Sequence, residues 1–336
     1  MGHIKPETLT LTSAGLYCRE GGFHVDPWKP VRRAVITHAH ADHARTGMGT
    51  YLVAETGEAL LRERVGKTIP ARALAFGERT TLDGVEVSFH PAGHILGSSQ
   101  VRIAGSAGVA VVTGDHNATH PHAAAEPFEA VPCDTLITES TFGLPIYQWP
   151  DPRQVMEAIQ AWWKANREAG RTSVLPAYPL GKTQRLLAGL DPAAGPIALA
   201  GAGRAFLPLY REAGIPLPDC CPLTEETVPE LKGRGLVIHS FAGHEPALLK
   251  RLQPLSRAGV SGWMQIRGVR RSRDVDRGFV LSDHSDWAGL LRCVRESGAR
   301  RVGVTHGQTE TFARYLQEVE GLEAFVVPTR FESGGD

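Results

Sequence analysis

The sequence has few cysteines, no long apolar run and no excess of charge of either sign. Its five cysteines are an odd number without a C-x-x-C spacing, which argues against a disulfide framework and against a structural zinc ribbon. No apolar run approaches the ~18 residues of a membrane helix, and the amino-terminal residues lack the pattern of a secretory signal. We therefore expect a soluble, cytoplasmic protein. The 36 basic residues balance 36 acidic ones, so overall charge does not indicate a polyanionic partner.

The sequence pattern changes near residue 150, which predicts more than one domain. A length of 336 residues favours two domains, or one domain that carries a large insertion. Residues 1–150 are β-rich, with short alternating apolar runs such as 79–91. A helix predicted over 151–169 is followed by alternating strands and helices up to residue 265, which indicates a parallel α/β unit.

Several predicted strands end in side chains that can bind a metal or transfer a proton. They are the strands of the segments VITHAHADH, VVTGDH, LITESTFG, VLSDHSD and GVTHG. Strand ends are where α/β proteins place their sites. A single strand of this kind is more often structural, but five together predict a shared site.

The segment THAHADH at 37–43 is the densest of these. Alternate residues of an extended chain point the same way, so His38 and His40 face one position while Asp42 and His43 turn towards a second. The competing interpretation is a polar loop that leads into a helix over 44–66. Three imidazoles so close together would repel one another once protonated and have no role in a core. We therefore favour a segment that serves two metal ions.

Three further residues complete the predicted dinuclear centre. His94 lies in a loop after the strand VEVSFH, Asp115 ends the strand VAVVTGD, and His306 ends RVGVTH. A carboxylate can bridge two cations where an imidazole cannot, so Asp115 is the predicted shared ligand. We expect one metal at His38, His40, His94 and Asp115, and the other at Asp42, His43, His306 and Asp115.

This ligand set predicts zinc and hydrolytic chemistry. Nitrogen-rich ligation suits zinc, with manganese or iron as alternatives, and argues against a magnesium or calcium site. Zinc lowers the pKa of bound water to about 7, so metal-bound hydroxide is the expected nucleophile. Asp26 is either a carboxylate that holds a ligand histidine or an ordinary turn residue.

The pattern H-x-H-x-D-H at 38–43, with the later His94, Asp115 and His306, resembles the metallo-β-lactamase fold, an αββα sandwich with its metals at one edge of the sheets. Simple members of that fold place the last histidine soon after the bridging aspartate. Here an α/β unit separates the two, and such an insertion resembles the β-CASP cap. The resemblance implies a metallo-β-lactamase domain formed by 1–150 and 266–336, with the cap at 151–265.

Finer motifs agree with this family. ESTFG at 139–143, SDHSDW at 282–287 and VTHG at 304–307 are similar to its acidic motif A and its His motifs B and C. Its members are nucleases in which the motif B histidine, oriented by the motif A acid, protonates the leaving oxygen. The resemblance therefore implies His284 as general acid and Glu139 as its orienting carboxylate, with Asp42 counted among the catalytic residues. The competing interpretation is a surface histidine paired with a carboxylate.

Basic side chains concentrate in the segments 178–185 and 266–273, and we expect them to contact phosphates. They are Lys182, Arg185, Arg267, Arg270, Arg271 and Arg273. The competing interpretation is a solvated surface. The GKT at 181–183 is not a Walker loop, because Pro176 stands in place of the leading glycine, and ATP binding is not expected.

These patterns predict a nuclease that hydrolyses phosphodiester bonds. The segments YPLGKTQR and SGWMQIRG resemble the bacterial ligase-associated DNA exonucleases of the family, so DNA is the expected substrate and DNA repair the expected role. The resemblance also implies a DNA ligase, a helicase or a second nuclease as partner. His306 argues for the alternative, an RNA-processing ribonuclease, because the eukaryotic DNA-repair branch that includes Artemis generally lacks the motif C histidine.

Two other classes of function remain as alternatives. A small-molecule ester or thioester hydrolase of the same fold would need neither the cap nor its arginines. A non-enzymatic scaffold is disfavoured because all seven ligand positions are filled.

Overall fold

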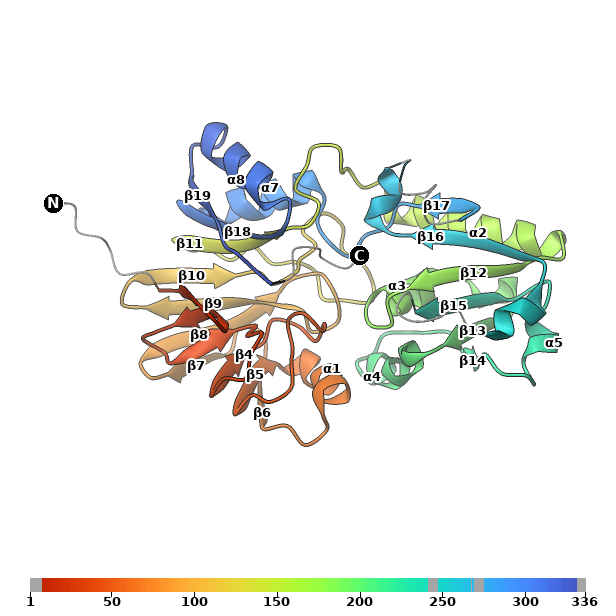
Figure 1. Ribbon diagram of the computed structural model, residues 1–336, viewed down its shortest axis with the longest axis horizontal. Coiled ribbons are helices and arrows are strands. Elements are labelled where there is room, and N and C mark those ends of the chain that lie inside the picture. The colour runs from red at the N-terminus through yellow and green to blue at the C-terminus, as the bar shows by residue number, and fades with distance from the viewer. Residues whose placement is uncertain (1–7, 241–246, 267, 269–274, 331–336) are drawn as a thin grey trace. The chain divides into compact units, whose positions relative to one another are not determined.

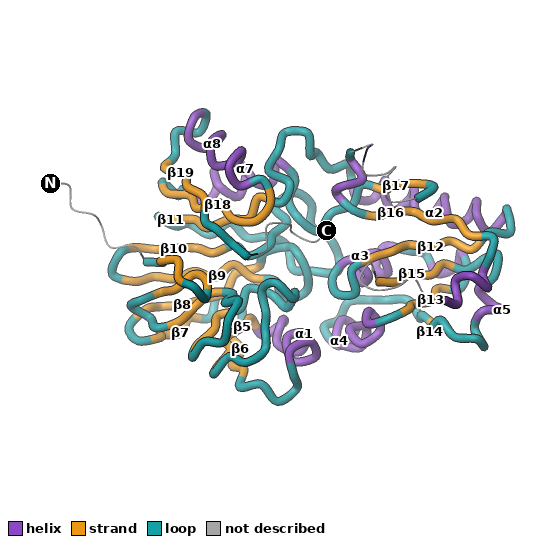
Figure 2. Tube along the Cα trace, viewed as in Figure 1, coloured by secondary structure: helices purple, strands orange, loops and turns teal. Residues whose placement is uncertain are grey.

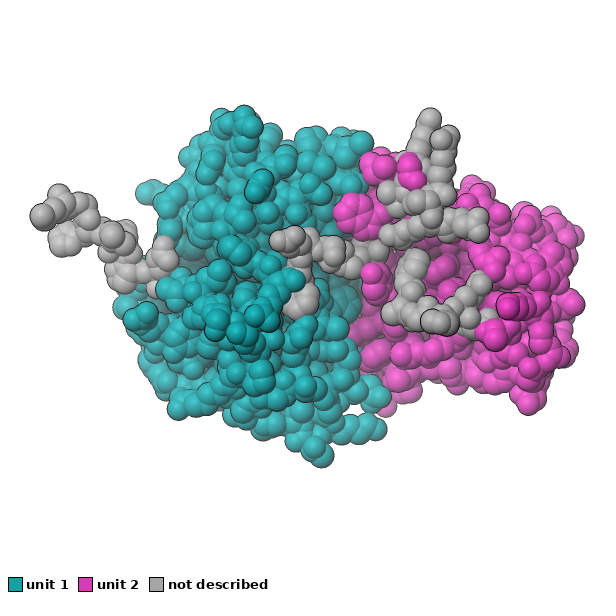
Figure 3. All heavy atoms as spheres, viewed as in Figure 1, with its two compact units in different colours: residues 1–148, 284–335 teal, residues 149–283, 336 magenta. Residues whose placement is uncertain are grey.

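The computed structural model describes residues 8–240, 247–266, 268 and 275–330. The chain forms two compact units, the first made of 1–148 and 284–335 and the second of 149–283 (Figure 3). The second division falls at 283/284, whereas the sequence predicted it at 265/266. This difference arises because β17 (Arg277–Phe279) pairs in parallel with β16 (Leu255–Val260) and so extends the sheet of the second unit.

The first unit contains two sheets (Figures 1 and 2). One sheet runs in the order β1 (Thr10–Thr12), β2 (Gly15–Cys18), β3 (Phe23–Val25), β4 (Arg33–Val35), β5 (Thr50–Ala54) and β6 (Ala71–Leu74). The other runs in the order β19 (Glu323–Val326), β18 (Arg301–Gly307), β11 (Thr135–Ser140), β10 (Gly108–Val112), β9 (Ser99–Gly105), β8 (Val85–Pro91) and β7 (Arg79–Leu82).

Alternation along the central strands explains the layers of this unit. Val111 of β10 and Leu136 of β11 pack in a core with helices α7 (Trp287–Ser297) and α8 (Thr309–Glu318). Their neighbours Val112 and Ile137 point to the opposite face and join the core between the two sheets. Helix α1 (Glu55–Val65) packs against β5 and β6. The αββα sandwich expected from the sequence is confirmed.

The second unit is built on one parallel sheet. Its order is β14 (Cys221–Pro222), β13 (Ile197–Ala200), β15 (Leu236–Ser240), β12 (Thr172–Ala177), β16 and β17. Among the described residues its helices are α2 (Pro152–Glu168), α3 (Lys182–Gly189), α4 (Leu207–Glu212) and α5 (Val228–Leu231), with 3-10 turns η1 (Pro192–Ala194), η2 (Ala202–Phe206), η3 (Ala247–Leu252) and η4 (Gly262–Gln265). Adjacent residues such as Val174 and Leu175 enter separate cores on the two faces, as a parallel sheet requires.

Helix α2 shows how well local signals predicted the start of this unit. The Asp151 side chain accepts a hydrogen bond from the backbone N–H of Arg153 at 2.8 Å, and Pro152 occupies the first turn. Val155, Ile159 and Trp163 then form the buried face. The helix therefore begins where the sequence predicted it.

The helix over 44–66, which belonged to the competing interpretation of the His-rich segment, differs from the structure. The segment contains a strand, because the apolar residues Tyr51–Ala54 pair with β4 and β6, and α1 begins only at Glu55. In the second unit, some of the expected helical segments are 3-10 turns: η2 precedes α4, and 247–252 is described only as η3. Among the described residues, no helix is long and apolar enough to cross a membrane.

Candidate metal centre

Three neighbouring strands carry predicted site residues to one edge of the second sheet. β10, β11 and β18 lie side by side and run parallel, so their carboxyl ends meet at that edge (Figure 1). Asp115 follows β10, Glu139 lies at the end of β11, and His306 lies at the end of β18. The His-rich segment follows β4 of the other sheet and is tied to β9, because Ser99 donates to the Thr37 carbonyl through its N–H (2.9 Å) and its hydroxyl (2.8 Å).

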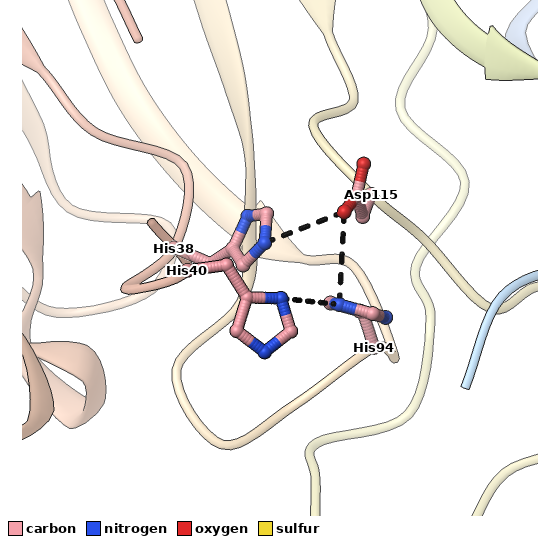
Figure 4. Close-up of side chains that lie close together, drawn as sticks. All are labelled: His38, His40, His94 and Asp115. Carbon is pink, nitrogen blue, oxygen red and sulfur yellow. Dashed lines mark hydrogen bonds and ion pairs between the residues drawn. The ribbon is translucent and has the colours of Figure 1, made fainter. Parts of the chain in front are cut away.

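Four of the predicted ligands form a first cluster, shown in Figure 4. One ligand atom from each of His38, His40, His94 and Asp115 lies within 4.8 Å of the others. Asp115 Oδ2 is 3.5 Å from His38 Nε2 and 3.8 Å from His94 Nε2. His94 Nε2 is 3.2 Å from His40 Nδ1. The four side chains therefore converge on a common point.

Asp42, His43 and His306 form a second cluster with the same spacing limit. His43 Nε2 lies 3.8 Å from Asp42 Oδ2, and the rings of His43 and His306 stack with centroids 5.3 Å apart. His43 Nε2 is also 3.3 Å from Asp115 Oδ1. Asp115 thus turns one oxygen to each cluster, which is the position that a bridging ligand would occupy.

Tight backbone approaches hold these loops in place. Gly114 has a positive φ of 56°, and a Cβ there would lie 2.6 Å from the Thr37 side chain, so only glycine fits beside the His-rich segment. His306 itself has φ 53°, a left-handed conformation that is uncommon for residues other than glycine. Such backbone strain tends to occur at functional sites.

Asp26 contacts a predicted ligand directly. Its Oδ2 lies 2.7 Å from His43 Nδ1, and its two oxygens accept hydrogen bonds from the N–H (2.8 Å) and the hydroxyl (2.6 Å) of Thr37. With Nδ1 donating to Asp26, the Nε2 atom of His43 is the nitrogen that faces the cluster. Asp26 therefore orients His43, one of the predicted ligands, and is more than an ordinary turn residue.

Glu139 and His284 form a buried pair beside the first cluster. His284 Nδ1 lies 2.8 Å and 2.9 Å from the two Glu139 oxygens, and the His284 ring is centred 4.6 Å from that of His94. The Glu139 carboxylate also accepts the N–H of His116 at 2.8 Å and the hydroxyl of Thr141. Both partners are about 1% exposed, so the competing interpretation, a surface histidine paired with a carboxylate, does not apply.

The charge environment keeps Glu139 ionised. Burial raises the pKa of this carboxyl group, but the charge and hydrogen bond of His284 outweigh burial and lower the pKa to about 2. An ionised Glu139 can only accept, so His284 Nδ1 must be the donor and carry its proton. The arrangement therefore leaves Nε2 of His284 as the nitrogen available for proton transfer.

His116 was missed by the sequence analysis. Its ring bonds Ser285 Oγ through Nδ1 (2.9 Å) and Thr138 Oγ1 through Nε2 (3.0 Å). Its carbonyl accepts the N–H of Ser285 at 2.8 Å. The side chain thus fixes the backbone beside His284, and its position directly after Asp115 was the only signal in the sequence.

Opposing electrostatic effects act on the clustered ligands. Burial, together with the charge of His43, holds the pKa of His38 well below its ordinary value. Burial also lowers the pKa of His43, but the charges of Asp115 and Asp42 outweigh it and raise that pKa well above the ordinary value. Burial raises the pKa of Asp115, yet His43 and His38 hold it well below the usual range. The site therefore concentrates ionised carboxylates and imidazoles that cannot all be protonated.

This donor set fits two divalent metal ions. Nε2 of His38 and Nε2 of His43 are buried and have no hydrogen-bond partner among the described residues. Leaving a buried polar atom without a hydrogen bond costs free energy, so these two nitrogens indicate a bound ligand that the protein chain itself does not supply. Imidazole nitrogens and carboxylate oxygens at this spacing are what zinc and related metals bind.

The predicted phosphate contacts have a different outcome. Lys182 and Arg185 are buried in the second unit, where Lys182 Nζ lies 3.2 Å and Arg185 Nη1 2.8 Å from the two oxygens of Asp283. They also donate to the carbonyls of Leu281 and Ser282. Their assignment to substrate phosphates is therefore corrected, because both cations are already used inside the fold. Arg267, Arg270, Arg271 and Arg273 lie outside the described residues.

Comparisons with known proteins identify relatives of the whole chain and of its parts. No family model matches. The chain is 33% identical over 318 residues to a "Probable DNA ligase" of Opitutus terrae, which covers 94% of this chain and 30% of that protein. It is 27% identical over 186 residues to "RNase aCSPSF2" of Saccharolobus solfataricus, a match that covers 47% of this chain and 37% of that protein. It is 30% identical over 129 residues to "Endoribonuclease ysh-1" of Neurospora crassa, a match that covers 37% of this chain and 15% of that protein. It thus spans well under half the length of each relative.

A solved structure shares the fold. The crystal structure of a protein of unknown function from Enterococcus faecalis superposes with a TM-score of 0.60 at 13% identity, covering 89% of this chain and 79% of that one. A likeness at this identity concerns architecture alone. The sequence relatives agree with the family that the motifs of this chain resemble, the β-CASP nucleases of the metallo-β-lactamase fold.

Proposed function

We propose that the protein is a metal-dependent nuclease that hydrolyses phosphodiester bonds. The observation that carries the proposal is the junction of two ligand clusters at Asp115, with the Glu139–His284 pair placed against the first cluster. Nucleophile activation and leaving-group protonation are the two tasks of such a hydrolysis, and this arrangement provides for both.

The chain's own residues divide the work. Divalent metal ions, which we propose to be zinc on the basis of the nitrogen-rich donors, would lower the pKa of water and neutralise charge on the phosphate. His284 donates its Nε2 proton to the departing oxygen and becomes neutral in doing so. Glu139 fixes the ring through Nδ1 and stabilises the protonated form that precedes the transfer. Asp26 and Thr37 hold His43 in position.

DNA is the proposed substrate, and exonucleolytic digestion during repair the proposed role. Support comes from the relative named as a DNA ligase, in which nearly the full length of this chain has a counterpart. A ligase and the enzymes that accompany it are accordingly the proposed partners.

RNA processing is the second candidate. It is favoured by the relatives named as ribonucleases and by His306, which lies in the second cluster. The two candidates use the same chemistry and differ only in the polynucleotide bound, so a substrate comparison separates them.

The test is digestion of end-labelled single- and double-stranded DNA and of matched RNA by metal-replete protein, with Asp42→Ala as the inactive comparison. We expect stepwise release of mononucleotides from DNA that the variant lacks. Cleavage confined to RNA would establish the second candidate. Failure to cleave either polymer, together with turnover of short esters, would refute the nuclease and favour a small-molecule hydrolase.

A further inference from the structure

A pocket in the first unit opens beside the second ligand cluster. Asp42, His43 and His306 line one end of it, and its empty volume is about 550 Å³ including the opening to solvent. The remaining wall is mainly apolar and includes Leu11, Leu16 and Trp28. An apolar wall with a few polar side chains gathered at one end is typical of pockets that hold small organic ligands.

Trp28 provides a fixed aromatic surface in this wall. Its indole Nε1 donates to the Ser13 carbonyl at 2.8 Å, and its backbone N–H donates to the Ala14 carbonyl at 3.0 Å. Both bonds tie it to the turn between β1 and β2, so the ring is held in place before any ligand binds. A rigid ring stacks on a flat partner with little loss of conformational entropy.

Leu11 forms part of the same wall and is 45% exposed, one of the few large apolar side chains at the surface of the described residues. Apolar surface around a recess is typical of a binding site for an apolar group. The occupant must therefore be flat and apolar at one end. Its other end must tolerate a carboxylate and imidazoles, which with metal ions bound would attract an anion.

We propose that this pocket binds the base of the substrate nucleotide whose phosphate lies at the metal centre. A nucleotide has both required ends, a flat base and an anionic phosphate, joined by a short sugar. Stacking on an aromatic ring is tolerant of sequence because every base has a flat face, which suits an enzyme that digests a strand step by step. The proposal rests on the proposed function, because it identifies the part of the nucleic acid that the same site recognises.

Binding to metal-replete protein provides a test that does not depend on turnover. Calorimetry would compare deoxyadenosine monophosphate with 2-deoxyribose 5-phosphate, which lacks the base. We expect the wild-type protein to prefer the nucleotide by roughly 5- to 150-fold, the range of base–aromatic stacking. Trp28→Leu should remove most of this preference without weakening the binding of the sugar phosphate.

A second variant covers the case in which Trp28→Leu fails to fold. Leu11→Trp places a large side chain at the exposed rim of the pocket and should block the base. Val319→Trp is the matched control, because Val319 is 63% exposed in the same unit and does not line the pocket. The control should bind both ligands as the wild type does.

The outcomes separate this proposal from the proposed function. Equal binding of the two ligands, or a Leu11→Trp variant that still prefers the nucleotide, would overturn the base pocket even if the protein digests DNA. Base-dependent binding that Leu11→Trp abolishes, in a protein that cleaves no nucleic acid, would support the pocket and refute the nuclease.

Discussion

The two units each bury a cluster of charged side chains, and the clusters differ in how their polar atoms are satisfied. In the second unit, Lys182 and Arg185 share the carboxylate of Asp283 and donate to neighbouring carbonyls. In the first unit, His38 and His43 each keep a buried Nε2 without a hydrogen-bond partner among the described residues. A cluster that satisfies itself stabilises a fold, whereas one that leaves buried ligand atoms unsatisfied is suited to bind something else.

The largest effect is expected from removing the carboxylate of Asp115, the group that joins the two ligand clusters. Asp115→Ala should lose bound metal and all detectable nuclease activity together, because both of its oxygens face imidazole nitrogens. Metal content per chain and cleavage of end-labelled DNA are the measurements. Asp83→Asn is the control, since that half-exposed carboxylate of the same unit pairs at the surface with Arg33 and Arg32, and asparagine tolerates its positive φ of 44°. A variant that keeps two metals per chain would refute the bridging position.

The next effect concerns proton transfer. His284→Ala should keep its metals but cleave about 10²- to 10⁴-fold more slowly, as expected when a general acid is lost. The defect should shrink for a phosphodiester with a nitrophenolate leaving group, which departs without a proton. His90→Ala, which changes a histidine paired with Glu129 elsewhere in the unit, should match the wild type. An equal defect on both substrates would assign His284 to structure.

Mutation of the buried cluster of Lys182, Arg185 and Asp283 should lower the stability of the fold and leave metal binding unchanged. Asp283→Ala leaves two buried cations without their carboxylate and should lower the free energy of unfolding by about 3–5 kcal/mol, measured in urea. The triple variant Lys182→Met, Arg185→Met, Asp283→Leu should recover most of this loss, since apolar groups need no partner. If the single variant unfolds like the wild type, the cluster does not contribute as we describe.

The smallest effect should come from the carboxylate behind His43. Asp26→Asn keeps the size and tolerates the positive φ of 43°, but its amide cannot replace both acceptor oxygens. Metal affinity, measured by competition with a chelator, should fall by about 10- to 100-fold. Unchanged affinity would mean that Thr37 and the surrounding loop hold His43 without help from Asp26.

Much of the site could be predicted because its signals are local. H-x-H-x-D-H lies within six residues, and alternation along an extended chain assigned His38 and His40 to one cluster and His43 to the other, as the structure places them. The same motifs implied the αββα sandwich through their resemblance to the metallo-β-lactamase fold, and the structure confirms it. Local patterns also misled, as at Tyr51–Ala54, where pairing with two strands overrode the expected helix.

The sequence by itself thus indicated the family resemblance with the sandwich that it implies, the inserted unit, and the side chains that cluster as predicted metal ligands. Only the tertiary structure decided that Lys182 and Arg185 serve Asp283, that Asp26 holds His43, and that Trp28 faces a pocket beside the ligands. The physical reason is distance along the chain: these partners lie 17 to about 100 residues apart, or meet across a cavity. The periodicity of apolar residues in the sequence indicates local structure, and it does not reveal contacts that form only when the sheets and loops come together.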